Sequence, residues 1–183
     1  MEKIILASGS PRRRELLELA GVSFTVQTVD VDESIPAGIS PEEAVQLLAA
    51  KKARAVESEG RPVLAADTVV ALDGMIFGKP QSEEDAKKML RTLSGKIHQV
   101  HTGVCIRRSA REEIFCETAQ VEFYPLTEEE IERYVASGEP MDKAGAYGIQ
   151  GKGALLVRRI EGDYYTIVGL PVARVVRALL YAD

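Results

Sequence analysis

The chain has 183 residues, 45% of them hydrophobic and 28% charged, which suits one substantial core and is short for two independent domains. We therefore expect a single domain over residues 1–183, with room for two lobes, and its formal net charge of -5 argues against binding a nucleic-acid polymer. No charged segment followed by an apolar stretch opens the sequence, and no apolar run approaches the roughly 18 residues that span a bilayer, so we expect a cytoplasmic protein.

The beginning of the chain predicts a strand, a tight turn and a helix. Residues 4–7 are apolar and include β-branched side chains, which is typical of a buried strand. Pro11 suits the first position of a helix, and Gly21 suits the position just after its end. Three consecutive arginines, residues 12–14, fall in the first turn. Cations oppose the helix dipole there, so three in a row are unfavourable unless a bound anion compensates them.

The turn before this helix has the small residues that an anion site needs. Ser8, Gly9 and Ser10 let an anion approach the unpaired N–H groups of the helix, while hydroxyls and arginines bind it. Phosphate is the expected ligand. The alternative is a surface helix that happens to begin with three arginines.

The next segment predicts a strand, an acidic loop and a second helix. In residues 23–29 apolar and polar side chains alternate enough for a strand, and residues 30–38 are an acidic loop. Residues 40–43 match a capping box, with proline at the first helical position. Lys52 stands on the apolar stripe of this helix, where an apolar side chain is expected. We expect its ammonium group to have an anion or a carboxylate as partner. In the alternative, the stem packs and the ammonium reaches outward to solvent.

Asp67 interrupts an almost unbroken apolar run over residues 63–72. Such runs are strands covered on both faces, where an unpaired ionised carboxylate is strongly unfavourable. We expect Asp67 to sit where the strand opens onto a cleft or a metal ion, and the alternative is a strand end where it bonds to backbone. The Asp73-Gly74 pair predicts a hairpin turn into a strand over residues 75–77.

In the rest of the chain, capping residues predict the helices, and alternating apolar and polar residues predict the strands. They are a helix from Ser82 to residues 93–95, strands 97–106 and 114–124 joined around residues 109–112, a helix from Thr127 to residues 137–138, a strand over 154–160 and a helix after residues 169–171. His98 and His101 face opposite sides of one strand, so they cannot chelate one metal ion together. Cys105 and Cys116 fit no zinc or redox pattern, and we expect free thiols.

Residues 139–153, EPMDKAGAYGIQGKG, show no helical or strand period. Glycine and proline surround isolated polar residues throughout this segment. Loops of this length in a compact domain tend to bind ligands, so we expect a binding loop, and a plain surface loop is the alternative.

Motifs along the whole chain resemble, in order, those of the Maf, or septum formation inhibitor, family. They are ASGSPRRREL, VDES before GISPEEAV, AADTVV, FGKP, LSGKIHQVHTGV, EPMDKAGAYGIQGKGAL and GDYYTIVGLP. The resemblance implies an α/β fold related to the inosine triphosphate pyrophosphatases, with two lobes and a central cleft around an elongated mixed sheet flanked by helices.

The same resemblance implies a metal-dependent nucleoside triphosphate pyrophosphatase. Its products are the nucleoside monophosphate and pyrophosphate. The AGAYGIQG loop is similar to the branch that acts on dTTP and UTP, and modified pyrimidine triphosphates are further candidate substrates. The branch that acts on N7-methyl-GTP has a different loop and stays as an alternative.

The residue types supply each part of this chemistry. The groups expected to bind phosphate are Ser8, Ser10, Arg12 and Arg13, with Lys52 and Lys79 as catalytic point charges. Glu33 and Asp67 are hard oxygen ligands that suit Mg²⁺ or Mn²⁺. By its position in the family motif, Asp67 is also the proton acceptor. A free Asp with a pKa of ~3.9 is a poor base, so we expect it to take a proton from a water that the metal has acidified.

Base choice is expected to fall to three residues that the resemblance marks, Arg12, Thr68 and Gln150. The carboxamide of Gln150 can complement both the O4 acceptor and the N3–H donor of uracil or thymine. Cytosine has the reverse polarity at both atoms, so a fixed carboxamide leaves buried groups unpaired against it.

The expected partner is a small nucleoside triphosphate, with no nucleic-acid polymer and no membrane; a homodimer is left open. A second hypothesis is a non-catalytic nucleotide-binding regulator of septation. A binder needs only the cations and the base-reading loop, whereas hydrolysis also needs a carboxylate and a metal ion. The presence of Asp67 with Glu33 favours the enzyme.

Overall fold

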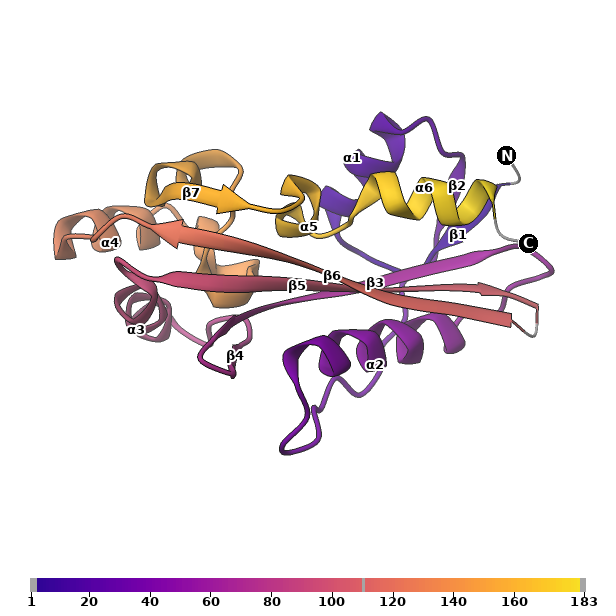
Figure 1. Cartoon of the computed structure of the whole chain (residues 1–183), viewed down its shortest axis with the longest axis horizontal. Coiled ribbons are helices and arrows are strands. Elements are labelled where there is room, and N and C mark those ends of the chain that lie inside the picture. Colours follow the sequence, from indigo (N-terminus) through magenta and orange to yellow (C-terminus); the bar gives the residue numbers. More distant parts are fainter. Residues whose placement is uncertain (1–2, 110, 182–183) are drawn as a thin grey trace. The chain divides into compact units, whose positions relative to one another are not determined.

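The computed structural model describes residues 3–109 and 111–181 (Figure 1). The chain divides into two compact units. The first comprises Met1–Thr68, Thr102–Glu117 and Gly169–Asp183, and the second comprises Val69–His101 and Thr118–Val168. The prediction of a single domain over residues 1–183 stays a prediction.

The strands form a mixed sheet, as the sequence predicts. Their bounds are β1 (Ile4–Leu6), β2 (Phe24–Val26), β3 (Val63–Leu72), β4 (Met75–Phe77), β5 (Ile97–Arg108), β6 (Arg111–Phe123) and β7 (Val157–Glu161). Within the described residues the seven strands have the order β2-β1-β3-β5-β6-β7, and β4 pairs with β3. Strand β1 is parallel to β2 and β3, whereas β3–β4 and β6–β7 are antiparallel pairs.

In the first unit, helices cover both faces of the sheet. Figure 1 shows α2 (Pro41–Arg54) on one face and α1 (Pro11–Leu19) and α6 (Val172–Leu180) on the other. Small side chains let α2 approach closely, and the buried cluster under it is Ile5, Ala7, Ala49, Ala50, Ala53, Val56, Val63, Ala65 and Cys105. At Gly103 on β5, an added Cβ would lie 2.4 Å from the Val45 carbonyl carbon. The α2 backbone therefore rests directly on that strand.

Polar contacts fix α6 to the hairpin strands of this unit. Arg108 Nη2 donates to the Ala178 carbonyl oxygen at 2.7 Å, and Arg174 Nη1 donates to Glu117 Oε1 at 2.5 Å. The Arg174 guanidinium also lies 4.1 Å from the centroid of the Phe115 ring. These contacts therefore join α6 to β5 and β6.

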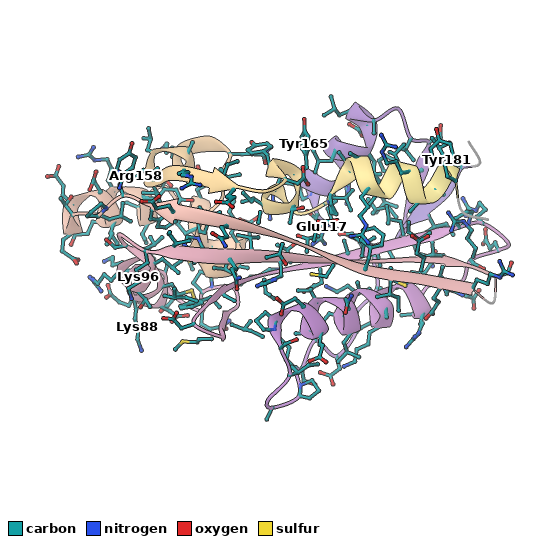
Figure 2. All side chains as sticks on the ribbon, viewed as in Figure 1. Lys88, Lys96, Glu117, Arg158, Tyr165 and Tyr181 are labelled. Atoms are coloured by element: carbon teal, nitrogen blue, oxygen red, sulfur yellow. The ribbon has the colours of Figure 1, made fainter. Side chains whose placement is uncertain are left out.

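The second unit has its own apolar core. Its helices are α3 (Glu83–Leu93), α4 (Glu128–Val135), the 3₁₀ helices η1 (Glu139–Asp142), η2 (Ala144–Ala146) and η3 (Gly151–Leu156), and α5 (Tyr164–Val168). The buried residues that they share with the strands include Phe77, Leu90, Leu93, Val121, Phe123, Ile131, Tyr134 and Tyr147. The rings of His98, Phe123 and Tyr147 meet edge to face within this core. Charged side chains such as Lys88 and Arg158 extend outward (Figure 2).

Capping and turn chemistry predicted the element starts correctly. Pro11 is the first residue of α1, and both capping boxes form, one at Ser40 and one at Thr127. Asp73 and Gly74 have φ of 51° and 79°, which is the turn geometry expected of this pair between β3 and β4.

Other boundaries differ from the prediction. Residues 139–153 are not free of helix, because η1 and η2 and the start of η3 lie there; such short turns contain too few residues to show a period. For the same reason α5, of five residues, was not predicted. Strand β7 begins at Val157 rather than at 154. The predicted hairpin turn includes residue 110, which lies outside the described residues.

Candidate active site

Arg13 is held in one orientation by three hydrogen bonds. Its Nε donates to the Gly169 carbonyl oxygen at 2.8 Å, Nη1 to Ser8 Oγ at 3.1 Å and Nη2 to Thr68 Oγ1 at 3.2 Å. Gly169 has φ 126°, a conformation that L-residues rarely adopt, and its backbone approaches the guanidinium closely. The sequence did not single out Gly169 or this role of its carbonyl.

The surroundings of Arg13 act on its charge in opposite directions. Desolvation lowers the pKa of the Arg13 guanidinium below its ordinary value, the nearby Asp67 carboxylate opposes that fall, and the Arg12 charge adds to it. Arginine stays protonated even so. The first unit therefore holds a fixed cation, partly buried, with further charges of both signs around it.

The turn before α1, where the sequence predicts an anion site, is held by hydrogen bonds to Ser8. Ser8 is buried, and its Oγ accepts from Arg13 and from the Ser10 N–H at 3.2 Å. Ser10 occupies the N-cap position of α1, yet its side chain makes no capping hydrogen bond, and the first helical turn contains no acidic residue. The positive end of the helix is therefore compensated neither by a cap nor by an acidic side chain of its first turn.

Lys52 bridges two carboxylates. Its Nζ lies 2.5 Å from Asp67 Oδ1 and 2.8 Å from Glu33 Oε1. The side chains of Lys52 and Asp67 are only 14% and 13% exposed, whereas that of Glu33 is 58% exposed. The predicted carboxylate partner of Lys52 is thus confirmed, and the outward orientation is wrong because a charge this shielded from water needs a partner.

Asp67 lies in the middle of β3, not at a strand end. The alternative in which it caps a strand end through backbone bonds is therefore wrong. Its neighbour Thr68 accepts from Arg13 and shares a 2.8 Å hydrogen bond with the Thr102 hydroxyl. Consecutive residues of one strand therefore contact Lys52 and Arg13, two of the predicted cations. Thr102 was not predicted, since a lone threonine in a strand gives no signal.

The acidic loop is tied to α2 by two consecutive lysines. Lys51 Nζ donates to the Asp32 carbonyl oxygen at 3.2 Å, next to the Lys52–Glu33 ion pair. The Ser34 N–H and hydroxyl donate to the Asp32 carboxylate, and these bonds lower the pKa of Asp32. The loop conformation that brings Glu33 to Lys52 is thus fixed by local bonds.

Lys79 and Gln150 belong to the second unit and are exposed there. The Lys79 carbonyl accepts from Gln81 Nε2, and Gln150 occupies the N-cap position of η3 without a side-chain capping bond. Their roles toward a substrate stay predictions. The same holds for the roles of Ser10 and Arg12.

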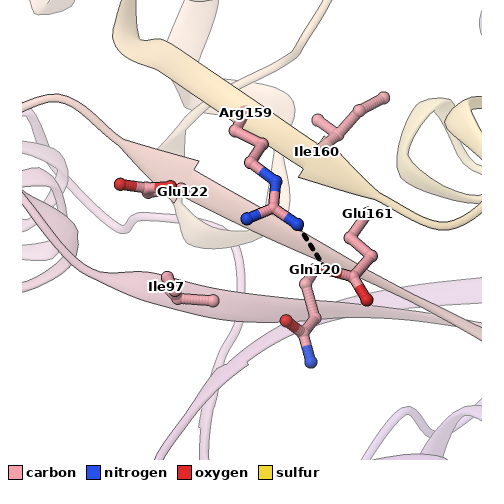
Figure 3. A pocket seen from close by; sticks show the side chains of 6 residues that line it. All are labelled: Ile97, Gln120, Glu122, Arg159, Ile160 and Glu161. Carbon is pink, nitrogen blue, oxygen red and sulfur yellow. Dashed lines mark hydrogen bonds and ion pairs between the residues drawn. The ribbon is translucent and has the colours of Figure 1, made fainter.

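The second unit also carries a shallow depression on its sheet. It is lined by Ile97, Gln120, Glu122, Arg159, Ile160 and Glu161 (Figure 3). Arg159 Nη2 donates to Glu161 Oε2 at 2.8 Å, and the third charged residue of the lining, Glu122, accepts from Arg158 Nη1 at 3.1 Å. None of the predicted site residues lines it.

Comparison with solved structures defines the class of fold. A HAM1 protein from Coxiella burnetii superposes with a TM-score of 0.53 at 18% identity, over 98% of each chain. Such a likeness shows the fold alone. It confirms the expected α/β architecture, a mixed sheet flanked by helices. No helix within residues 3–109 and 111–181 has both the length and the hydropathy that crossing a membrane requires.

Comparison of sequences gives the family. The model of the Maf-like proteins matches residues 3–182, and the chain belongs to this family. A relative from Bacillus mycoides (strain KBAB4) is 56% identical over 185 residues, covering 100% of this chain and 97% of the relative. Another from Bacillus cereus (strain B4264) is 55% identical with the same coverage. Both relatives are named dTTP/UTP pyrophosphatase.

Proposed function

We propose that this protein hydrolyses dTTP and UTP to the nucleoside monophosphate and pyrophosphate. The observation that carries the proposal is the full-length likeness, at 56% identity, to a protein named for that activity. The cluster of Arg13, Lys52, Asp67 and Glu33 in the first unit agrees with it, because these are the residue types that phosphoanhydride hydrolysis requires.

The phosphate-binding part of the proposal falls to α1 and the turn before it. Arg13 is already oriented by three bonds, so little side-chain entropy is lost when it binds an anion. Arg12 and Ser10 lie on the same turn, where the helix dipole also favours negative charge. Lys79, from the second unit, is proposed as a further cation for the phosphates.

A divalent cation fits the carboxylates that Lys52 bridges. Glu33 and Asp67 each place one oxygen within 2.8 Å of the same ammonium nitrogen, so both already face one cationic centre. Among the described residues no group of three or more His, Cys, Asp or Glu side chains could hold a metal ion. The proposed ion is therefore held by two carboxylates, and Mg²⁺ usually keeps several waters. When bound, such an ion lowers the pKa of a coordinated water and neutralises phosphate charge.

Protein side chains are proposed to accept the proton of the attacking water and to stabilise the leaving group. Asp67 Oδ1 accepts the proton of the attacking water, and Lys52 holds this carboxylate in place until substrate phosphates compete for its ammonium. Arg12, Arg13 and Lys79 stabilise the charge that develops on the departing pyrophosphate.

A covalent intermediate on the enzyme is not needed. Ser8 Oγ accepts a hydrogen bond from the Arg13 guanidinium, which cannot serve as its general base. Burial raises the pKa of the Cys105 thiol to about 11, so this cysteine is not an activated nucleophile. Direct attack by water at the α-phosphorus is therefore the simplest course.

Base choice is assigned to Gln150, Thr68 and Arg12, following the family motifs. The Thr68 hydroxyl already accepts from Arg13, which limits the orientations left to its hydrogen. The Gln150 carboxamide, in contrast, is exposed and does not cap its own helix. It therefore has both a donor and an acceptor to offer a pyrimidine.

The proposal also covers location. Cys105 is a free thiol, which supports a reducing compartment, and we infer a cytoplasmic protein.

The products of hydrolysis in ¹⁸O-labelled water test the proposed function. With UTP or dTTP and Mg²⁺, we expect ¹⁸O in the monophosphate and unlabelled pyrophosphate, identified by ³¹P spectroscopy and mass spectrometry. Orthophosphate should appear only after a separate inorganic pyrophosphatase is added. Direct release of orthophosphate with a diphosphate, a clear preference for N7-methyl-GTP, or tight nucleotide binding without turnover would each contradict the proposal.

A further inference from the structure

One carboxylate organises the loop that contains Gln150. Glu139, the first residue of η1, accepts from the Lys152 N–H at 3.0 Å through Oε2 and from the Gly153 N–H at 3.1 Å through Oε1. These N–H groups belong to the first turn of η3, whose donors have no partner within the helix. Glu139 therefore caps η3 from a distant point in the sequence.

Because Glu139 supplies this capping, the side chain at the N-cap position of η3 makes no capping hydrogen bond. Gln150 holds that position, where a polar side chain commonly bonds back to the first helical N–H groups, and it makes no such bond. Because Glu139 accepts from the Lys152 and Gly153 N–H groups, these two donors do not compete for the Gln150 carboxamide. An external ligand can then take both its donor and its acceptor.

Tyr134 connects this arrangement to the core of the second unit. Its side chain is buried in the core, and its hydroxyl donates to Glu139 Oε1 at 3.2 Å and accepts from the Gly148 N–H at 3.1 Å. Burial raises the pKa of the Tyr134 hydroxyl, so it stays a neutral donor. The backbone is thus held on both sides of Gln150, at Gly148 and at residues 152–153.

Two glycines of the loop lie so close to the Glu139 carboxylate and its partners that a side chain would not fit there. A Cβ at Gly151, which has φ 65°, would lie 2.8 Å from Glu139 Oε2. A Cβ at Gly153 would lie 1.9 Å from the Gly148 carbonyl oxygen and 2.8 Å from the Tyr134 hydroxyl. In addition, Lys143 Nζ donates to the Glu139 carbonyl oxygen at 2.6 Å, so the backbone of Glu139 is also fixed.

We propose that Glu139, held by Tyr134, is a positioning residue that sets pyrimidine selection by fixing the backbone around Gln150 and leaving its carboxamide to the base. The inference rests on the proposed function. It explains how the backbone that carries an exposed carboxamide is fixed although the Gln150 side chain is not used in capping. Glu139 does not touch the reacting atoms, so its effect should appear in substrate choice rather than in chemistry.

The test compares Glu139→Gln with Glu132→Gln, the same change at an exposed position of α4. The ratio of kcat/KM for UTP to that for CTP is measured for each variant. Glu139→Gln replaces an acceptor oxygen with a donor group facing backbone N–H donors, so we expect the ratio to fall roughly tenfold. The loss should lie in the KM for UTP more than in kcat, since base contacts form equally in bound substrate and transition state. Glu132→Gln should leave the ratio unchanged.

Two further measurements separate this role from general loosening. Hydrogen exchange at the Lys152 and Gly153 amides should accelerate in Glu139→Gln while β3 stays protected. In a Gln150→Ala background, Glu139→Gln should have no further effect on the ratio, because it acts through Gln150. If Glu139→Gln does not fold, Tyr134→Phe is used in its place, since it removes only the bridging hydroxyl.

The outcomes distinguish the inference from the proposed function. If wild-type protein prefers UTP and Gln150→Ala removes that preference, but Glu139→Gln leaves the ratio intact, the inference is overturned and the function stands. The inference would also be overturned if Glu139→Gln lowered the ratio of kcat/KM for UTP to that for CTP equally in the wild-type and Gln150→Ala backgrounds. If wild-type protein does not hydrolyse UTP, the proposed function fails, and the inference fails with it.

Discussion

The pair formed by Asp67 and Lys52 shows how residue chemistry determines local geometry. Each charge is largely shielded from water, which is unfavourable for either one alone. Lys52 contacts both Asp67 and Glu33, so its positive charge compensates the buried negative charge of Asp67 and is itself compensated. That cluster also explains why a lysine occupies a helix stripe otherwise made of apolar side chains.

Asp67→Asn should separate binding from catalysis. The change conserves volume while removing the proton acceptor and one charge from the proposed metal site, so we expect turnover to fall by about 100-fold or more. Nucleotide affinity, measured by calorimetry, should change much less. Asp73→Asn, in the exposed turn between β3 and β4, makes the same chemical change and should leave turnover at the wild-type level. Near-wild-type turnover in Asp67→Asn would remove this residue from the mechanism.

At the scale of elements, α2 carries Lys52 and is placed by its contact with β5. The contact is possible because Gly103 has no side chain where the backbone of Val45 crosses the strand. Alanines 49, 50 and 53 continue the same close approach along the helix. The distance from Lys52 to Asp67 on β3 therefore depends on small residues that take no part in chemistry.

Gly103→Ala should strongly destabilise the protein. Its Cβ would lie 2.4 Å from the Val45 carbonyl atoms and 2.7 Å from the Gln46 nitrogen, all of them backbone, so the helix itself would have to move. We expect a loss of about 3 kcal/mol in the free energy of unfolding. The control is Gly78→Ala, whose Cβ would meet nothing within 4 Å. Equal unfolding midpoints in urea for the two variants would refute the close approach.

For the molecule as a whole, a buried histidine couples stability to pH. His98 lies between Phe123 and Tyr147, and its Nε2 is 2.8 Å from the Tyr147 hydroxyl. Burial lowers the pKa of His98 from 6.5 to about 4. The unfolded chain therefore binds a proton between pH 6.5 and pH 4 that the folded chain does not. The corresponding stability is complete above pH 6.5 and is lost as the pH falls toward 4.

Urea unfolding at pH 7.5 and pH 5.0 checks this expectation. From the two pKa values, His98 alone should reduce the free energy of unfolding by about 2 kcal/mol at pH 5. His98→Gln removes the titrating group, so its stability should change less over the same interval than that of the wild type. An identical change in both proteins would show that other groups cause the acid sensitivity.

Much of the fold was predictable because its signals are local. Ser40 and Thr127 cap their helices through bonds to residues three positions away, and the Asp73-Gly74 turn depends on two residues. The limits of β3 follow from one apolar run. The elements that escaped prediction, η1, η2, η3 and α5, are too short for a pattern to repeat.

The sequence by itself determined the family, through motifs that follow one another in order along the chain, and the residue types available for phosphate and metal chemistry. Only the tertiary structure decided which partners those residues have. Lys52 meets Asp67 and Glu33, Arg13 meets Gly169 and Thr68, and Glu139 caps a helix that begins twelve residues later. Such contacts depend on how separate segments pack against one another, and no period or spacing within a single segment encodes that packing.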